Sequence, residues 1–186
     1  DRRFNPHIAR DEYTLLTHLH AGGLPVPKPH LVDDSCALFP IPYLVVDYVD
    51  GMTDFAPADL PDFLHQLATT LAAIHRANIA IENVSFLPLQ ADLIMQTLQK
   101  QPDNLHLLQQ RIRETLAPLW PLTVINTHVL LHGDYWTGNT VWREGRLAAV
   151  IDWEDAVIGD PLADLDALNH VQATFIAGKK MIGVGA

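Results

Sequence analysis

The stretch His132-Gly133-Asp134-Tyr135-Trp136-Thr137-Gly138-Asn139 gathers polar side chains between two short apolar segments. A polar cluster that connects two predicted strands is a common place for a binding or catalytic site. A second carboxylate, Asp152, follows the apolar run Leu147 to Ile151, and Glu144-Gly145 predicts a hairpin turn between the two. Two carboxylates and one amide oxygen form the hard, oxygen-rich donor set that magnesium prefers. The stretch therefore predicts a site for a divalent cation.

The spacing within this loop indicates a particular chemistry. Asp134 is followed by four residues and then Asn139, as in the kinase catalytic loop, where the aspartate orients the acceptor hydroxyl and the asparagine holds a magnesium ion. Each residue alone also allows a structural interpretation: His132 as a brace of the loop, Asn139 as a turn former and Asp152 as a strand-end cap. The order, the spacing and the hairpin together favour the phosphoryl-transfer site.

Helical and extended segments can be placed on both sides of the loop. Apolar residues at three- and four-residue steps predict a helix that ends near His75, with Asp59 as its N-cap. The other predicted helices cover His7 to Ala21, Leu93 to Lys100 and Leu105 to Leu116. Predicted strands cover Ala37 to Phe39, Tyr43 to Tyr48, Val129 to Leu131, Thr140 to Trp142 and Leu147 to Ile151. This order indicates an α+β fold, with poor order expected for residues 178–186.

Composition and charge limit the function. The 186 residues hold 12 lysines and arginines against 22 acids, a net charge of −10 that argues against a nucleic-acid partner. Residues 144–176 carry seven acids and one base, which suits metal cations or a cationic substrate, although most such runs are solvated faces. No apolar run is long enough to predict a membrane span. The single cysteine, Cys36, excludes an intrachain disulfide and favours a reducing, cytoplasmic compartment.

Several motifs together resemble the aminoglycoside phosphotransferase and choline kinase family, the small-molecule branch of the protein-kinase-like fold. The strongest are the loop His132 to Asn139, the segment Ile151-Asp-Trp-Glu-Asp155 and the segment Gly159-Asp-Pro-Leu-Ala-Asp-Leu165. Weaker similarity extends to the helix with Glu12, the following Gly23-Leu-Pro-Val-Pro27, the hinge-like segment Leu44 to Gly51, and Leu71-Ala-Ala-Ile-His75. The resemblance covers roughly residues 8–170.

The resemblance implies a reaction and a set of roles. ATP would be the cosubstrate, Mg²⁺ the metal, and a hydroxyl of a small molecule the acceptor, with cationic molecules of the aminoglycoside or choline type as candidates. Asp134 is then the catalytic base, and Asn139 and Asp152 are the metal ligands. Nucleotide binding falls to Glu12, Asp47, Tyr48 and Val49, acceptor binding to Glu154, Asp155 and Asp160, and support of the loop to His132 and Asp164.

Some of these residues also allow simpler roles. Glu12 could be an exposed helical acid, and Asp160 and Asp164 could cap a following helix. His75 is interpreted as a packing residue or a partner of the helix dipole, because kinase chemistry needs no histidine base.

Parts of the family pattern have no counterpart in the sequence. A glycine-rich phosphate loop and a strand lysine precede the family's glutamate helix, and the residues before His7 hold neither. We therefore expect a partial N-lobe and hinge at residues 1–50 and a mainly helical C-lobe at residues 51–186, shortened at its C-terminus. The chain is then either a fragment of a longer enzyme or a shortened relative with impaired catalysis.

Two other functions compete with this interpretation. A catalytically silent binding or scaffold module would explain the missing lysine, but not the presence of Asp134, Asn139 and Asp152. A metal-dependent hydrolase that uses His132, Asp134 and Asp152 would need further imidazole or carboxylate ligands beside them.

Overall fold

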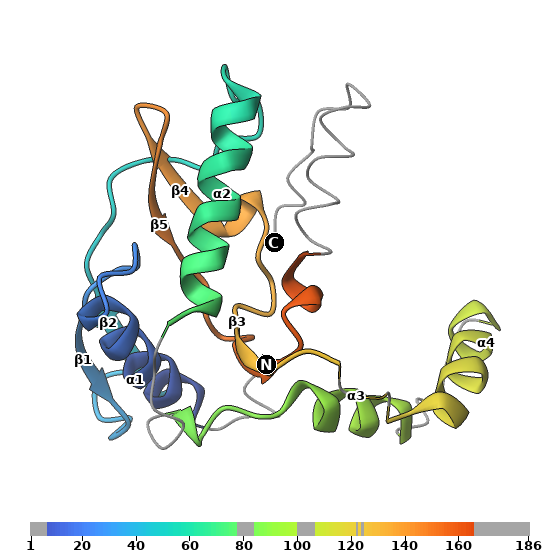
Figure 1. Cartoon of the computed structure of the whole chain (residues 1–186). Coiled ribbons are helices and arrows are strands. Elements are labelled where there is room, and N and C mark those ends of the chain that lie inside the picture. Colours follow the sequence, from blue (N-terminus) through green and yellow to red (C-terminus); the bar gives the residue numbers. More distant parts are fainter. Residues whose placement is uncertain (1–6, 78–83, 100–106, 122, 124, 166–186) are drawn as a thin grey trace.

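The computed structural model (Figure 1) describes residues 7–77, 84–99, 107–121, 123 and 125–165. Its helices are α1 (Ile8–Ala21), α2 (Leu60–His75), α3 (Gln90–Gln99) and α4 (Leu107–Leu116), with short 3₁₀ turns at Ala117–Leu119 and Thr137–Asn139. Its strands are β1 (Pro29–Asp33), β2 (Tyr43–Val46), β3 (Val129–Leu131), β4 (Thr140–Arg143), β5 (Arg146–Val150) and β6 (Val157–Gly159). Within the described residues the strands form the antiparallel pairs β1–β2, β3–β6 and β4–β5. The predicted α+β class is confirmed.

Helix α1 packs beside the strand pair β1–β2 (Figure 1). It begins one residue after the predicted start and buries Leu15, Leu16 and Leu19 on one face, as the apolar spacing predicts. Gly23 follows the helix with a φ of 77°, and the next amide, of Leu24, donates to the carbonyl of Leu19 at 3.1 Å. Glycine adopts this left-handed conformation without the penalty of a Cβ atom, so the helix ends here.

The prediction of a strand at Ala37 to Phe39 is wrong. These residues form bends, and β2 pairs instead with Pro29–Asp33, for which no strand was predicted. Cys36 has a φ of 54°, and Pro40 restricts the residue before it, so this segment cannot continue a ladder. Strand β1 can start at Pro29 because a missing amide is tolerated at the first residue of a strand.

Helix α2 lies along the hairpin β4–β5 (Figure 1). The predicted cap is confirmed, since the side chain of Asp59 accepts the amide of Asp62 at 3.0 Å. Phe63 stacks on Trp142 with ring centroids 4.2 Å apart. The side-chain amide of Gln66 donates to the carbonyl of Gly145 at 2.9 Å and accepts the amide of Leu147 at 3.0 Å. These contacts hold the hairpin against the helix. They thereby position the two segments at the open end of the hairpin, residues 132–139 before β4 and residues 151–156 after β5.

The strand pair β3–β6 joins the far ends of these two segments, because β3 precedes residue 132 and β6 follows residue 156. Leu131 pairs with Val157, and Val129 pairs with Gly159. Strand β6 was not predicted, because three residues between acidic segments carry too little pattern for a strand.

The remaining helices lie to one side of the molecule. Helix α3 begins three residues before the predicted start, and α4 ends at the predicted residue. Figure 1 shows both extending away from α1. The predicted helix positions 100, 105 and 106, like the tail 178–186, lie outside the described residues. No helix in the described ranges is both long and apolar enough to cross a membrane.

Candidate active site

The loop after β3 is held by a carboxylate from far along the chain. Asp164, with its side chain 1% exposed, accepts the amide of His132 through Oδ2 and the amide of Gly133 through Oδ1, each at 3.0 Å. Residues 162–165 form a helical turn, and this turn carries Asp164 to the loop. Two consecutive amides are therefore satisfied by one buried carboxylate, which fixes the backbone just before Asp134.

His132 braces the loop from within. Its ring is fully buried, and its Nε2 lies 3.0 Å from the carbonyl of Ile151. Its Nδ1 accepts the amide of Asp134 at 3.3 Å, so the proton of the neutral ring is on Nε2. Burial lowers the pKa of His132, because desolvation disfavours the charged imidazolium. A neutral ring that links the Asp134 loop to the end of β5 is a structural element of the site.

Asp134 and Asn139 are joined by hydrogen bonds. The Nδ2 of Asn139 donates to both the backbone carbonyl and the Oδ2 of Asp134, at 2.9 Å each. This use of Nδ2 leaves Oδ1 as the oxygen that Asn139 can offer to a cation. Asp134 itself is exposed, whereas Asn139 is 7% exposed. The loop therefore presents one accessible carboxylate on a buried support.

The end of β5 brings Asp152 next to this pair. The amide of Ile151 donates to the carbonyl of Asn139 at 3.0 Å, so Asp152 follows a residue bonded to the loop. Asp152 is exposed and has a φ of 66°, a left-handed conformation that is uncommon for a residue with a Cβ atom. Such backbone conformations cluster at functional sites.

The donor set fits magnesium better than a protein-only metal cage. In the part of the chain that the structure describes, no three side chains of histidine, cysteine, aspartate or glutamate are grouped to hold a metal ion. Magnesium is commonly bound by one or two carboxylates together with substrate phosphates and water. Asn139 and Asp152 could hold it in this way, whereas the hydrolase alternative gains no support from this geometry.

Glu12, on α1, lies beside the segment that carries Asp152. It accepts the backbone amide of Trp153, and its charged neighbours Asp152 and Glu154 are both acids. Burial, followed by repulsion from these acids, raises the pKa of Glu12 from 4.5 to about 6. The simpler interpretation as an exposed helical acid is wrong, because Glu12 is a partly buried carboxylate in an acidic environment.

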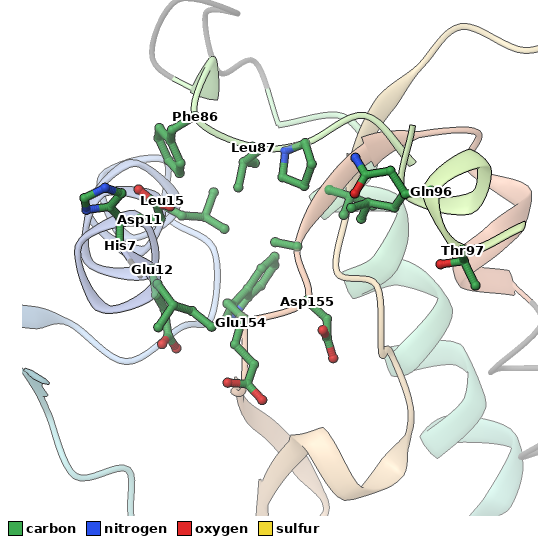
Figure 2. Close-up of a pocket in the computed structure, with 16 residues that line it drawn as sticks. His7, Asp11, Glu12, Leu15, Phe86, Leu87, Gln96, Thr97, Glu154 and Asp155 are labelled. Atoms are coloured by element: carbon green, nitrogen blue, oxygen red, sulfur yellow. The ribbon is translucent and has the colours of Figure 1, made fainter. Parts of the chain in front are cut away.

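A cavity of about 730 Å³ lies between α1, the segment after Asp152, and α3. In Figure 2, Glu12, Glu154 and Asp155 direct their carboxylates to one side of it, and Phe86 and Leu87 lie on the other. Its remaining lining is His7, Ile8, Asp11, Leu15, Pro88, Leu93, Gln96, Thr97, Trp153, Ala156 and Val157. The cavity thus combines apolar walls with an acidic edge, and its volume lies in the range of small-molecule sites.

Other residues proposed from the sequence lie elsewhere. Asp160 does not line the cavity: it accepts the side-chain amide of Asn126 at 3.0 and 3.1 Å and the amide of Leu162 at 3.0 Å, so it caps the following turn. Asp47 forms an exposed ion pair with His30, with the Oδ1 and Nε2 atoms 2.5 Å apart, which lowers the pKa of Asp47. The structure therefore joins Asp134, Asn139, Asp152, Glu12, Glu154 and Asp155 in one region, without Asp160.

The hinge segment has few ties to this region. The amide of Asp47 donates to the carbonyl of Lys28 at 2.9 Å, so that donor is already used within the fold. Tyr48 is 87% exposed. Neither Asp47, Tyr48 nor Val49 lines the cavity.

Two structural contacts of the loop had weak or no sequence signals. A Cβ atom on Gly133 would lie 2.1 Å from the carbonyl oxygen of Asp155, and the φ of Gly133 is 85°. The only sequence signal for this close approach was that residue 133 of the motif is a glycine, which has no Cβ atom and tolerates a positive φ. The Nε2 of His75 lies 2.9 Å from Oδ2 of Asp164, a contact across 89 positions that no local pattern could indicate.

The paired short strands, the loop between them and the supporting helix define a protein-kinase-like fold, and solved structures agree. A putative aminoglycoside phosphotransferase from Ralstonia eutropha superposes with a TM-score of 0.66 at 16% identity, over 94% of this chain and 67% of that one. The streptomycin–ATP ternary complex of the phosphotransferase APH(2″)-IIa gives a TM-score of 0.64 at 19% identity, over 88% and 60% of the two chains.

Residues 2–176 match the phosphotransferase enzyme family (APH), and the chain belongs to that family. Among curated relatives, acyl-CoA dehydrogenase family member 11 is 29% identical in Homo sapiens and 27% identical in Gallus gallus. These alignments cover 86% and 87% of this chain but only 22% of either relative, so the chain spans about a fifth of their length.

Proposed function

We propose that the chain carries the transfer site of a phosphotransferase that moves the γ-phosphoryl group of Mg·ATP to a hydroxyl of a small molecule. The observation that carries this proposal is the link between Asn139, Asp134 and the residue before Asp152. Membership of the phosphotransferase enzyme family supports it, as do the nucleotide complexes of structurally similar phosphotransferases. On this proposal, residues 1–50 belong to the N-lobe and hinge, and residues 51–186 to the C-lobe.

Asp134 is the proposed base. Its exposed carboxylate accepts the proton of the acceptor hydroxyl as that oxygen forms its bond to phosphorus and the bond to the leaving ADP oxygen breaks. The hydrogen bond from Asn139 engages Oδ2, so Oδ1 is the oxygen proposed to accept the proton. When bound, magnesium neutralises negative charge on the phosphates; Asn139 and Asp152 are its proposed protein ligands.

The nucleotide is proposed to contact α1 and the hinge. Glu12 would pair with a cation that binds the phosphates, because a partly buried carboxylate surrounded by acids gains most from a positive neighbour. The adenine would lie against the backbone of Tyr48 and Val49, and Asp47 would contribute its carbonyl, since its amide is already bonded.

The cavity beside Glu154 and Asp155 is the proposed acceptor site. Asp134 does not itself line the cavity, but Asp155, which does, is in backbone contact with Gly133, the residue before the proposed base. The acidic edge favours an amine-bearing alcohol, in line with the streptomycin and hygromycin B bound by structurally similar phosphotransferases. The apolar walls and the acyl-CoA dehydrogenase name of the curated relatives support a second candidate acceptor, a hydroxylated acyl chain.

A transfer assay tests the proposal directly. The chain is incubated with Mg·ATP and a panel of amino alcohols, amino sugars and hydroxyacyl thioesters, and phosphorylated products are detected by mass spectrometry. We expect at least one product that disappears in Asp134→Asn. ATP binding without any product would favour the silent binding module, and failure to bind Mg·ATP would overturn the proposal.

A further inference from the structure

The strand pair β1–β2 has one covered face and one exposed face. Helix α1 packs beside the pair, and Leu44 and Val46 of β2 pack against the core. Because successive side chains of a strand point to opposite faces, Val45 lies on the other face. Val45 pairs with Leu31 of β1, and the two residues are 41% and 45% exposed. The outer face of the pair therefore presents apolar side chains to solvent.

The loop between the two strands extends this apolar surface. Phe39 meets Tyr43, the first residue of β2, edge to face, with ring centroids 5.0 Å apart. Tyr43 lies two residues before Val45 and hence on the same face of the strand. Contiguous apolar surface with a polar rim marks interaction sites. We call the five exposed residues of this surface the β1–β2 patch: Leu31, Leu38, Phe39, Ile41 and Val45.

The β1–β2 patch has charges of opposite sign at the two ends of β1. Lys28 comes directly before the strand and Asp34 directly after it, and both are exposed. Arg10 contacts Oδ2 of Asp34 from α1, so Oδ1 is the oxygen that can take a further cation. Leu31 is the middle residue of the strand. A two-fold axis near Leu31 would therefore place Lys28 of each copy beside Asp34 of the other.

We propose that the β1–β2 patch binds a second copy of this chain, with the two β1 strands antiparallel across a two-fold axis. Such a contact joins a patch to itself, so the apolar centres meet and each charged end meets its opposite. Figure 1 shows β1 at the margin of the molecule. The net charge of −10 opposes association, but at about 0.15 M salt this repulsion is screened beyond about 8 Å.

The first test measures self-association by sedimentation equilibrium in about 0.15 M salt. As the concentration rises from about 1 to 500 μM, the range that covers weak interfaces, we expect the average mass to rise from that of one 20.7 kDa chain toward twice that value. Leu31→Ser should weaken association at least about 10-fold, because it removes an apolar side chain from the centre of both halves. Leu116→Ser is the matched control, since Leu116 of α4 is 44% exposed.

The second test exchanges the charges at the ends of β1. Lys28→Asp places acids at both ends, and Asp34→Lys places bases at both ends, so each variant alone brings like charges together at both contacts. We expect each to associate at least about 10-fold more weakly than the unchanged chain. An equimolar mixture of the two variants brings opposite charges together at both contacts, and we expect it to recover association as a mixed dimer. A fluorescent label on one variant identifies that dimer during sedimentation.

Three outcomes would overturn the proposal. The mass could stay at that of one chain throughout the series, which would leave the patch to a partner of another kind. Leu31→Ser and Leu116→Ser could weaken association equally, or the mixed charge variants could fail to associate, and either result would assign association to a different surface. Absence of phosphoryl transfer would overturn the proposed function but would leave these masses unchanged, so the two proposals fail separately.

Discussion

The two sides of the proposed site differ in how they are held. Around the Asp134 loop, the supporting side chains of His132 and Asp164 are buried and bonded to the backbone. Along the strand pair β1–β2 and the hinge, the ion pair of His30 and Asp47 is exposed, at 45% and 53% for the two side chains. We therefore expect the chain's own residues to pre-organise the transfer chemistry, and the nucleotide to order the segment proposed to face it.

Electrostatics separate the two sides in the same way. The pKa of Asp47 is lowered, chiefly by its hydrogen bond to His30, so this acid is stabilised as an anion by a local partner. The pKa of Glu12 is raised by burial and by Asp152 and Glu154. At the proposed transfer site, a bound cation would relieve the repulsion among these acids.

Removal of the proposed base should have the largest effect. Asp134→Asn keeps the shape of the side chain and its bond to Asn139, but removes the proton acceptor. We expect kcat to fall about 10²- to 10⁴-fold. The Kd of Mg·ATP, measured by calorimetry, should change little. Retained turnover would show that Asp134 is not the base.

Substitution of Gly133 should have the largest effect on stability. Gly133→Ala places a Cβ atom 2.1 Å from the Asp155 carbonyl oxygen at a φ of 85°, and we expect a loss of about 3 kcal/mol in denaturant unfolding. Gly145→Ala is the matched control, because Gly145 also has a positive φ, 74°, but no atom within 4 Å of the added carbon. Equal losses at the two positions would contradict the tight packing of the loop.

Neutralisation of Glu12 should stabilise the protein at neutral pH. Because the folded pKa of about 6 exceeds the ordinary value of 4.5, the native state binds the proton more tightly than the unfolded state. The unfolding free energy therefore falls as the pH rises from 4.5 through 6, by about 1 to 2 kcal/mol after allowance for partial exposure.

Glu12→Gln should remove this fall, so that the variant is more stable than the unchanged protein above pH 6 and similar to it near pH 4.5. Unfolding curves at several pH values, up to about pH 7.5, measure the difference. Glu144→Gln, at the exposed hairpin turn, provides the control. A variant that is less stable than the unchanged protein at neutral pH would show that Glu12 has a favourable partner.

The exposed ion pair should contribute least. His30→Ala removes the partner of Asp47, and because solvent screens such pairs we expect no measurable change in the unfolding free energy. The pKa of Asp47, followed by NMR titration, should rise toward its ordinary value. A loss of stability comparable to that in Gly133→Ala would remove the contrast between the two regions.

The sequence predicted those features that are encoded locally. The helix over residues 60–75 with its Asp59 cap, the hairpin turn at Glu144-Gly145 and the strand before the Asp134 loop are all confirmed. Each has a short-range signature: a capping side chain, a turn pair with positive φ, or an apolar run beside polar residues.

The features that were missed depend on long-range contacts. Strand β6 has three residues and exists because β3 pairs with it, and the contact of His75 with Asp164 joins residues 89 positions apart. The cavity likewise needs α1, α3 and the segment after Asp152 to meet in space. Neither periodicity nor motif spacing contains that information. The roles of the site residues stay predictions.

Calorimetric titration of Mg·ATP tests the central claim most directly, namely that the hairpin ends form a magnesium–nucleotide site. The titration is made with the unchanged protein, with Asp152→Ala, and with Glu114→Ala, which removes an exposed acid of α4 as a charge-matched control. We predict magnesium-dependent binding that is lost in Asp152→Ala and retained in Glu114→Ala. Binding that is independent of magnesium, or equal in all three proteins, would contradict the account.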